Sequence, residues 1–117
     1  MTRSSTTYSR GDVVIVPFAF SDRDAFKNRP ALIVSSDSFH QARNEVIVAA
    51  MTTRVREPLL AGDYRLVDWQ ACGLPKPTIV TGILRTAKAY LIARKLGEVS
   101  ASEMEAIDSQ LRRVLAL

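Results

Sequence analysis

The hydrophobic pattern of this chain changes its period once, close to residue 100. Before that point the apolar residues gather in short runs rich in Val and Ile, a pattern that is typical of β-strands. After it, apolar residues recur every three or four positions, which predicts one amphipathic helix over Ser100–Val114. We therefore expect a mainly β (α+β) fold, in which a small twisted barrel of SH3-like type carries a C-terminal helix.

Six segments carry the strand pattern. They are Asp12–Phe18, Pro30–Ser35, Glu45–Thr53, Tyr64–Asp68, Thr78–Arg85 and Ile92–Leu96. The third segment is apolar on both alternating faces, so we expect it to lie centrally and to be covered on both sides. Pro30 is acceptable as the first residue of its strand, and Gly82 predicts a bulge in the fifth strand. One helical turn is expected around Phe39–Arg43.

The terminal helix carries its own start signal. Ser100 followed by Glu103 is a capping-box pattern, in which each side chain can accept a hydrogen bond from an unpaired amide of the first turn. One face of the helix is apolar and should pack on the sheet. Its residues are Met104, Ile107, Leu111, Val114 and Leu115.

The length and the cysteine content fit a single domain over residues 10–117, preceded by a flexible polar arm over residues 1–9. No apolar run is long enough for a signal peptide or a membrane span. The single cysteine, Cys72, can form no internal disulfide and lies at no zinc-ligand spacing, so we expect a small buried residue. This cysteine usage is consistent with a cytoplasmic protein.

The chain is basic, with 16 Lys and Arg against 12 Asp and Glu and a formal charge of +4. A polyanionic partner such as a nucleic acid is therefore plausible, because phosphates are attracted to such a surface. Charge alone carries modest weight, since many small basic proteins bind no nucleic acid.

Several kinds of enzyme are excluded by their missing motifs. The chain has no G-x-S-x-G, no H-E-x-x-H, no Walker loop and no G-x-G-x-x-G. It also has one histidine, His40, so an acid–base mechanism with two histidines cannot operate within one protomer. We expect His40 to be an ordinary surface residue rather than a catalyst.

Four motifs follow one another in a fixed order. They are R-G-D-V-V-I-V-P-F (Arg10–Phe18), N-R-P-A-L-I-V-S (Asn28–Ser35), V-A-A-M-T-T (Val48–Thr53) and G-L-P-K-P-T-I-V (Gly73–Val80). In this order and at this spacing they resemble the MazF/PemK/Kid toxin family. The resemblance continues through Leu84–Thr86, Leu96–Ser100 and the terminal helix, and so covers nearly the whole chain after residue 9.

The resemblance implies a fold, an activity and partners. The family's fold is an SH3-like barrel with a C-terminal helix, which forms a homodimer with a groove across the interface. Its activity is the cleavage of single-stranded RNA (mRNA) at a motif of a few bases, without a metal or a cofactor. A cognate antitoxin blocks the groove with a disordered tail.

The resemblance also implies the site. Arg29 and Thr52 match the pair that the family uses at the scissile phosphate. A guanidinium can donate two hydrogen bonds to the charged oxygens of a pentacoordinate phosphorus, and a threonine hydroxyl can donate another. Asp24 is the candidate third catalytic group, and the candidate substrate-binding residues are Lys27, Thr53, Arg54 and Arg85. Without the resemblance, Arg29 would be read as a surface ion pair with Asp22 or Asp24, and Thr52 as a simple β-former.

One departure from the family bears on activity. Some members carry a catalytic arginine and aspartate in the late strand, at positions that by spacing are Val80 and Gly82 here. Neither side chain can do acid–base work, but other members lack that arginine and rely on the Arg/Thr pair.

Two other functions remain open. A gyrase poison of the CcdB type shares the expected fold but acts through a C-terminal Trp-Gly-Ile, whereas this chain ends in Leu-Ala-Leu. A catalytically silent member would bind RNA or an antitoxin without cleaving.

Overall fold

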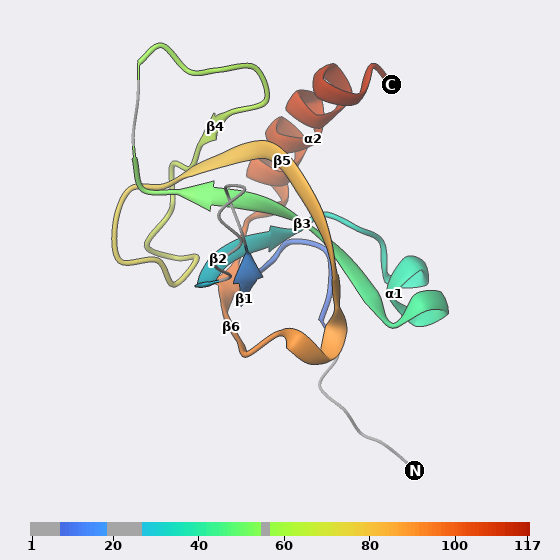
Figure 1. Cartoon of the computed structure of the whole chain (residues 1–117). Helices are drawn as coiled ribbons and strands as arrows, with labels where there is room; N and C mark the ends of the chain where they lie inside the picture. Colours follow the sequence, from blue (N-terminus) through green and yellow to red (C-terminus); the bar gives the residue numbers. More distant parts are fainter. Residues whose placement is uncertain (1–7, 19–26, 55–56) are drawn as a thin grey trace.

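One antiparallel sheet, curled on itself, forms most of the described structure (Figure 1). The computed structural model describes residues 8–18, 27–54 and 57–117. The strand order is β4-β5-β3-β2-β1-β6, and every pair of neighbours in it is antiparallel. The elements, in chain order, are β1 (Asp12–Phe18), β2 (Lys27–Ile33), α1 (Asp37–Arg43), β3 (Glu45–Thr52), β4 (Tyr64–Arg65), β5 (Ile79–Lys88), the 3₁₀ turn η1 (Ala89–Leu91), β6 (Arg94–Glu98) and α2 (Ala101–Leu115).

This arrangement confirms the expected fold class, a curled β-sheet with a C-terminal helix. Strand β1 has the predicted bounds, and β5 runs three residues beyond its predicted end because Lys88 pairs with Glu45 at the start of β3. The expected helical turn before β3 is a short helix, α1, capped by Ser36. The prediction that Pro30 opens its strand is wrong, since β2 begins at Lys27 opposite Phe18.

The core consists of two clusters of buried side chains, one on each face of the sheet. The helix-side cluster contains Val13, Leu32, Ala49, Met51, Leu66, Cys72, Leu74, Val80, Val99, Met104 and Ile107. The far-side cluster contains Val14, Val16, Phe18, Ala31, Ile33, Val46, Val48, Ala50 and Ile92. Strand β3 contributes to both, which confirms its predicted central place, and Cys72 is buried as expected.

Helix α2 covers the helix-side cluster through its first two turns. Met104 and Ile107 are buried, and Leu111 packs at the edge of the cluster. The last turn extends beyond the core, since Val114 is 39% exposed and Leu115 49%. The predicted apolar face is therefore correct in its residues, and its end reaches β5, where the partly exposed Val114 lies next to Gly82.

Half of the predicted capping box is present. The Ser100 hydroxyl accepts a hydrogen bond from the Glu103 amide at 3.3 Å. The Glu103 carboxylate, however, points to another part of the chain, where it accepts from the Tyr64 hydroxyl at 2.8 Å and from the amides of Val67 and Asp68 at 2.7 and 3.1 Å. The expected return bond to Ser100 is replaced because these three donors hold the buried carboxylate.

The Glu103 carboxylate also affects two neighbouring acids. Burial, and then the hydrogen bond to Glu103, raise the pKa of Tyr64 to about 12. Burial, and then the charges of Glu103 and Asp68, raise the pKa of Cys72 to about 11. Both groups are therefore protonated, and the Cys72 thiol is unreactive, at neutral pH.

Strand β5 carries the bulge that Gly82 predicts. The register with β3 shifts between Ala49 and Met51, and the Thr81 hydroxyl donates to the Ala50 carbonyl inside the shift. Gly82 lies against Gly62, and a side chain at Gly82 would meet Val114 at 2.9 Å. Val80 belongs to the helix-side cluster and is 1% exposed. These two positions are therefore packing positions in this chain.

The prediction that His40 is a surface residue is wrong. Its side chain is 10% exposed and joins two segments. Nε2 lies 2.6 Å from the Ser35 hydroxyl, and Nδ1 lies 3.1 Å from the Tyr8 carbonyl. Sequence reasoning missed this role because Tyr8, which lies 32 residues before His40, approaches it only through the tertiary fold. Neither α1 nor α2, the α-helices of the described part of the chain, combines the length and apolar character that a membrane crossing needs.

Candidate functional site

A pocket of about 480 Å³ opens where β2 and β3 separate. It is lined by Arg29, Pro30, Met51, Thr52, Thr53, Arg54, Leu74, Pro75 and Thr78. Arg29 and Pro30 come from β2, Met51–Arg54 from the end of β3 and the turn after it, and the last three from the loop that leads into β5. Its volume lies within the range of roughly 300–1,000 Å³ that is usual for small-molecule sites.

Pro30 explains why the two strands separate here. The Ile33 carbonyl accepts from Gly11 on the β1 side, and the Val34 amide donates to Ile47 on the β3 side. Backbone groups alternate between the two sides of a strand, so the nitrogen of Pro30 faces β3. It carries no hydrogen, and the β2–β3 pairing extends no further than Ala31 and Ala50. The missing donor therefore leaves the pocket open without disturbing the pairing with β1.

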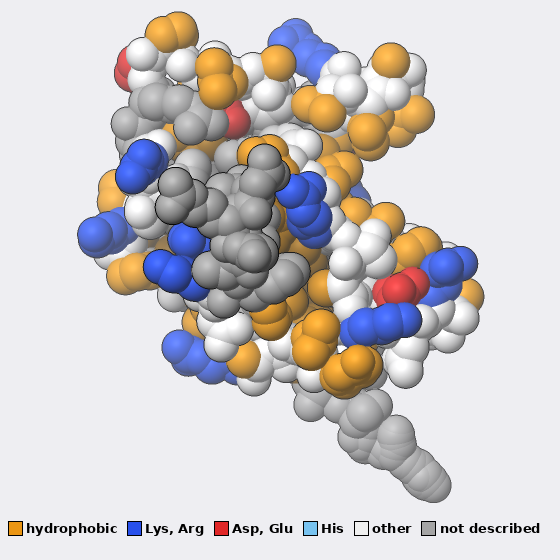
Figure 2. All heavy atoms as spheres, in the orientation of Figure 1, with side chains coloured by type: hydrophobic (Ala, Val, Ile, Leu, Met, Phe, Trp, Pro, Cys, Tyr) orange, Lys and Arg blue, Asp and Glu red, His pale blue; other side chains and the backbone are white. Residues whose placement is uncertain are grey.

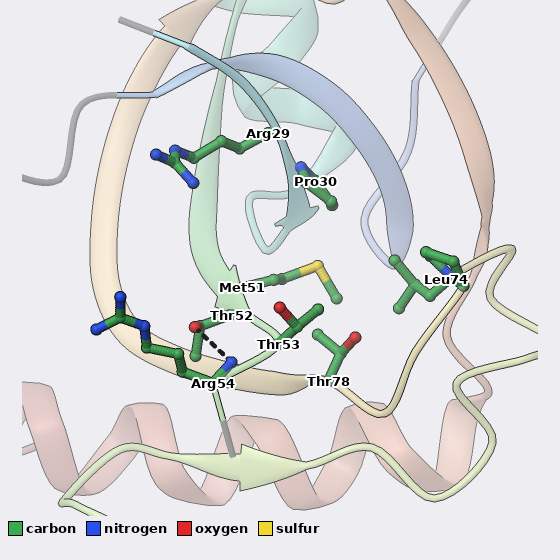
Figure 3. A pocket seen from close by; sticks show the side chains of 9 residues that line it. Arg29, Pro30, Met51, Thr52, Thr53, Arg54, Leu74 and Thr78 are labelled. Carbon is green, nitrogen blue, oxygen red and sulfur yellow. Dashed lines mark hydrogen bonds between the residues drawn. The ribbon is translucent and has the colours of Figure 1, made fainter. Parts of the chain in front are cut away.

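Strand alternation divides the pocket into two walls. Arg29 shares a face of β2 with Ala31 and Ile33, and Thr52 shares a face of β3 with Val48 and Ala50. All four apolar partners belong to the far-side cluster, so Arg29 and Thr52 lie on one face of the sheet. Figure 3 shows Arg29, Thr52 and Arg54 together on one side of the pocket. We call these three residues the polar wall.

The polar wall is held by its own backbone. The Thr52 hydroxyl accepts a hydrogen bond from the Arg54 amide at 3.1 Å, which fixes the turn after β3 (Figure 3). An accepting hydroxyl keeps its hydrogen for donation to a ligand. Among the described residues, no acidic side chain lies within ion-pair distance of Arg54. The wall therefore presents a positive charge and a hydroxyl donor to the pocket.

The opposite side of the pocket is apolar. Pro30, Met51, Leu74 and Pro75 form it, and we call them the apolar wall. Figure 3 places Thr53 and Thr78 next to Met51 on this side. The Thr78 hydroxyl donates to the Lys76 carbonyl at 2.8 Å and so holds the loop. Of the described residues that line the pocket, none carries a carboxylate, an imidazole or a thiol.

The structure brings together four of the seven predicted site residues, namely Arg29, Thr52, Thr53 and Arg54. Lys27 and Arg85 do not line the pocket. Lys27 pairs with Phe18 at the start of β2, and Arg85 is exposed on β5 with its guanidinium 5.6 Å from the centre of the Phe18 ring. Asp24 lies outside the described residues.

Alternation nevertheless places the two outlying cations on the face of the polar wall. Lys27 is two residues from Arg29, and Arg85 pairs with Val48, a member of the far-side cluster. Figure 2 shows more Lys and Arg than Asp and Glu side chains on the side of the molecule that it presents. The surface around the polar wall is therefore suited to an extended anion.

Sequence reasoning missed the apolar wall. The motif Gly73–Val80 carries part of the resemblance, but nothing in it indicates that Leu74 and Pro75 line a pocket with Arg29. The one available signal is the pair of prolines beside a strand, which makes a stiff segment but does not say what it faces.

Comparisons with known proteins find relatives of this chain in one toxin family. The model of a family described as PemK-like, MazF-like toxin of type II toxin–antitoxin system matches residues 9–115. Endoribonuclease MazF6 of Mycobacterium tuberculosis is 33% identical over 93 residues, which cover 78% of this chain and 81% of the relative.

Solved structures share the fold. The M. tuberculosis toxin MazF-mt6 superposes with a TM-score of 0.73 and 25% identity, covering 91% of this chain and 97% of that one. An endoribonuclease from a mycobacterial species, solved in complex with its cognate antitoxin, superposes with a TM-score of 0.76 and 22% identity, covering 94% and 96% of the two chains.

Proposed function

This chain belongs to the PemK-like, MazF-like toxin family of type II toxin–antitoxin systems, and on that premise we propose that it cleaves single-stranded RNA in the pocket between β2 and β3. The observation that carries the proposal is the polar wall, in which Arg29, Thr52 and Arg54 share one side of an open pocket. A guanidinium and a hydroxyl side by side are donors suited to the oxygens of a phosphodiester.

The reaction is an attack of the ribose 2′-hydroxyl oxygen on the adjacent phosphorus. The new P–O bond forms as the bond to the 5′-oxygen of the next nucleotide breaks. The products carry a 2′,3′-cyclic phosphate and a 5′-hydroxyl. Negative charge builds on the equatorial phosphate oxygens between these two events, and Arg29 stabilises that charge with its forked donors. Thr52 donates a further hydrogen bond and fixes the phosphate's orientation.

Arg29 acts mainly through its charge. A guanidinium loses its proton only at a very high pKa, so it is a poor base in water. The proton of the 2′-hydroxyl passes to water, to the phosphate itself or to Asp24, and the leaving oxygen takes up a proton from solvent. None of these steps uses Val80 or Gly82, which are packing positions here.

The remaining predicted substrate-binding residues contact the RNA on either side of the cleaved bond. Thr53 and Arg54 belong to the pocket itself, whereas Lys27 and Arg85 lie further along the same face. Strand residues rise about 3.3 Å each, so the four steps along β3 from Val48, the partner of Arg85, to Thr52 span about 13 Å. That separation assigns Arg85 to a phosphate other than the scissile one.

The proposed partners are a cognate antitoxin and a second copy of the chain. The antitoxin follows from family membership and from the mycobacterial complex. Exposed apolar side chains near the end of α2, among them Leu60 at 57% and Leu115 at 49%, support a homodimer. Light scattering at micromolar concentration should then give twice the 12.9 kDa monomer mass. The site of action is the cytoplasm, where mRNA is found.

One experiment separates this function from the two alternatives. Purified protein is incubated with a long single-stranded RNA in EDTA, and the fragment ends are analysed. The proposal predicts specific fragments with cyclic phosphate and 5′-hydroxyl ends at an undiminished rate. Retention of uncut RNA would indicate a silent binder, and inhibition of gyrase without cutting would indicate a CcdB-like poison.

A further inference from the structure

The apolar wall is not used by the proposed phosphate chemistry. Leu74 and Met51 are buried members of the helix-side cluster, and each also lines the pocket. Pro30 and Pro75 complete the wall with two rings of fixed shape. Together they give the pocket an apolar surface. Figure 3 shows Leu74 on the far side of the pocket from Arg29 and Arg54.

The wall is rigid because its loop is closely fitted to β6. Gly73 has a φ of +79°, and a side chain there would meet the Leu96 carbonyl oxygen at 2.1 Å. On the other strand, a side chain at Gly97 would meet the Cys72 carbonyl oxygen at 2.4 Å. The Leu74 amide is held by the Trp69 carbonyl at 3.2 Å. The wall is therefore formed before any ligand arrives, and binding to it costs little ordering entropy.

We propose that the apolar wall binds the nucleobase of the nucleotide next to the scissile phosphate. This inference rests on the proposed function, because the polar wall would fix a phosphate in the same pocket. Base and phosphate are joined through one ribose, so a phosphate held on one wall brings a base to the other. A flat nucleobase packs well against proline rings and a leucine side chain.

The wall recognises the base by contact area. None of its four side chains carries a polar hydrogen or an oxygen, so no side chain of the wall reads the edge of the base. Packing against the face of a base tolerates different bases, since each has a π-face. The wall therefore sets a preference at one nucleotide position by size, and edge contacts elsewhere supply the remaining specificity.

Pro75 is the residue to test, since it is exposed at the pocket and belongs to neither core cluster. A short RNA is prepared with a single abasic ribonucleotide, 2′-hydroxyl retained, on either side of the cleaved bond. For the unsubstituted protein, one abasic position should lower kcat/KM about tenfold, which is near the lower end of the loss for a base stacked on an aromatic side chain. For Pro75→Ala the penalty at that position should shrink to about threefold or less, with KM raised and kcat retained.

Pro77→Ala is the matched control, because Pro77 is an exposed proline of the same loop that does not line the pocket. It should keep the full abasic penalty. An unchanged penalty in Pro75→Ala would overturn the inference. So would a fall in kcat that is equal for intact and abasic RNA, because that result would assign Pro75 a structural role alone.

Failure of the proposed function has a different signature. If the unsubstituted protein cleaves no RNA, the same abasic series is measured as Kd by fluorescence anisotropy. A penalty at one position that Pro75→Ala removes would uphold the base site in a protein that only binds. If the unsubstituted protein has the same Kd for intact RNA and for every abasic RNA, both the base site and its link to RNA are overturned.

Discussion

The polar side chains of two regions differ in how many hydrogen-bond partners they have within the chain. Under α2, the buried Glu103 carboxylate accepts three hydrogen bonds, from Tyr64, Val67 and Asp68, and so joins the helix to the segment that contains β4. At the pocket, Arg54 has no ion pair within the described chain, and the Thr52 hydroxyl keeps its hydrogen. The first region uses its polar groups to hold the fold, whereas the second leaves them facing an opening.

The difference shows where this fold can hold a ligand. A polar group that is already bonded to its own chain has nothing left to offer, and breaking its bonds would cost stability. The hydroxyl of Thr52, at the end of the interrupted strand pairing, instead keeps a hydrogen that it can donate to a ligand. Substitutions in the two regions should therefore separate stability from activity.

Arg29→Ala is expected to have the largest effect. Removing the forked donor should lower cleavage by about a hundredfold or more, the loss found for a transition-state donor elsewhere. Arg29→Lys should recover only part of the rate, because an ammonium cannot make the bidentate contact. Initial rates on one RNA substrate provide the measurement.

Arg94→Ala removes the same charge from β6, away from the pocket, and should cut at nearly the rate of the unsubstituted protein. If Arg29→Ala also cut at that rate, the site assignment would be wrong whatever the fold.

Glu103→Ala should give the next largest effect, and on stability instead. Three donors would lose their acceptor, so we expect the free energy of unfolding to fall by roughly 2–3 kcal/mol. Glu103→Gln should recover part of the loss, because its carbonyl oxygen can still accept from Tyr64 and Val67 while its amide nitrogen would face the amide of Asp68. Urea unfolding measures the change, and Glu105→Ala, an exposed carboxylate of the same turn, is the control. A stability loss no larger than that of the control would contradict the comparison.

Thr52→Val should produce a smaller loss of activity. The substitution keeps the β-branched shape but removes the hydroxyl, so cleavage should drop by about tenfold, the value of one neutral hydrogen bond. Thr52→Ser keeps the hydroxyl and should remain within about threefold of the original rate. Equal rates for the two variants would remove Thr52 from the proposed mechanism.

The pH dependence of stability should show the smallest effect. Tyr64 and Cys72 have pKa values raised to about 12 and about 11 from 10.0 and 9.0, so the folded state binds these protons more tightly than the unfolded state. Their contribution is fully present below about pH 9 and is lost as pH rises toward 12. Urea unfolding at about pH 8 and about pH 10.5 should therefore show a decline, and the double variant Tyr64→Phe, Cys72→Ala should decline less. An equal decline would show that other groups dominate.

The sequence predicted the elements whose signals are local. Strand β1 is a Val and Ile run that begins after Gly11, and α2 starts at a serine cap followed by a 3.6-residue pattern. The start of β2 was missed because Lys27 and Asn28 are polar, and only their pairing with β1 makes them a strand. The second half of the capping box failed for the same reason, since Tyr64 lies 39 residues from Glu103.

The residues of the candidate site likewise fall into those that the sequence predicted and those that it did not. Arg29 and Thr52 were found through the resemblance of their motifs to a family, because neither residue is distinctive in isolation. Leu74 and Pro75 were not found at all. They reach the pocket only because β5 pairs with β3 and the loop before it is fitted against β6. No local pattern records such a distant contact.

Pro30 has a consequence for how this protein can evolve. The opening between β2 and β3 depends on a covalent ring that lacks a hydrogen, and not on the particular side chains around it. Exposed residues of the lining such as Thr53 and Pro75 can therefore be exchanged without restoring the strand pairing. A non-proline residue at this position would restore an amide donor that faces β3, at the point where the pairing now ends.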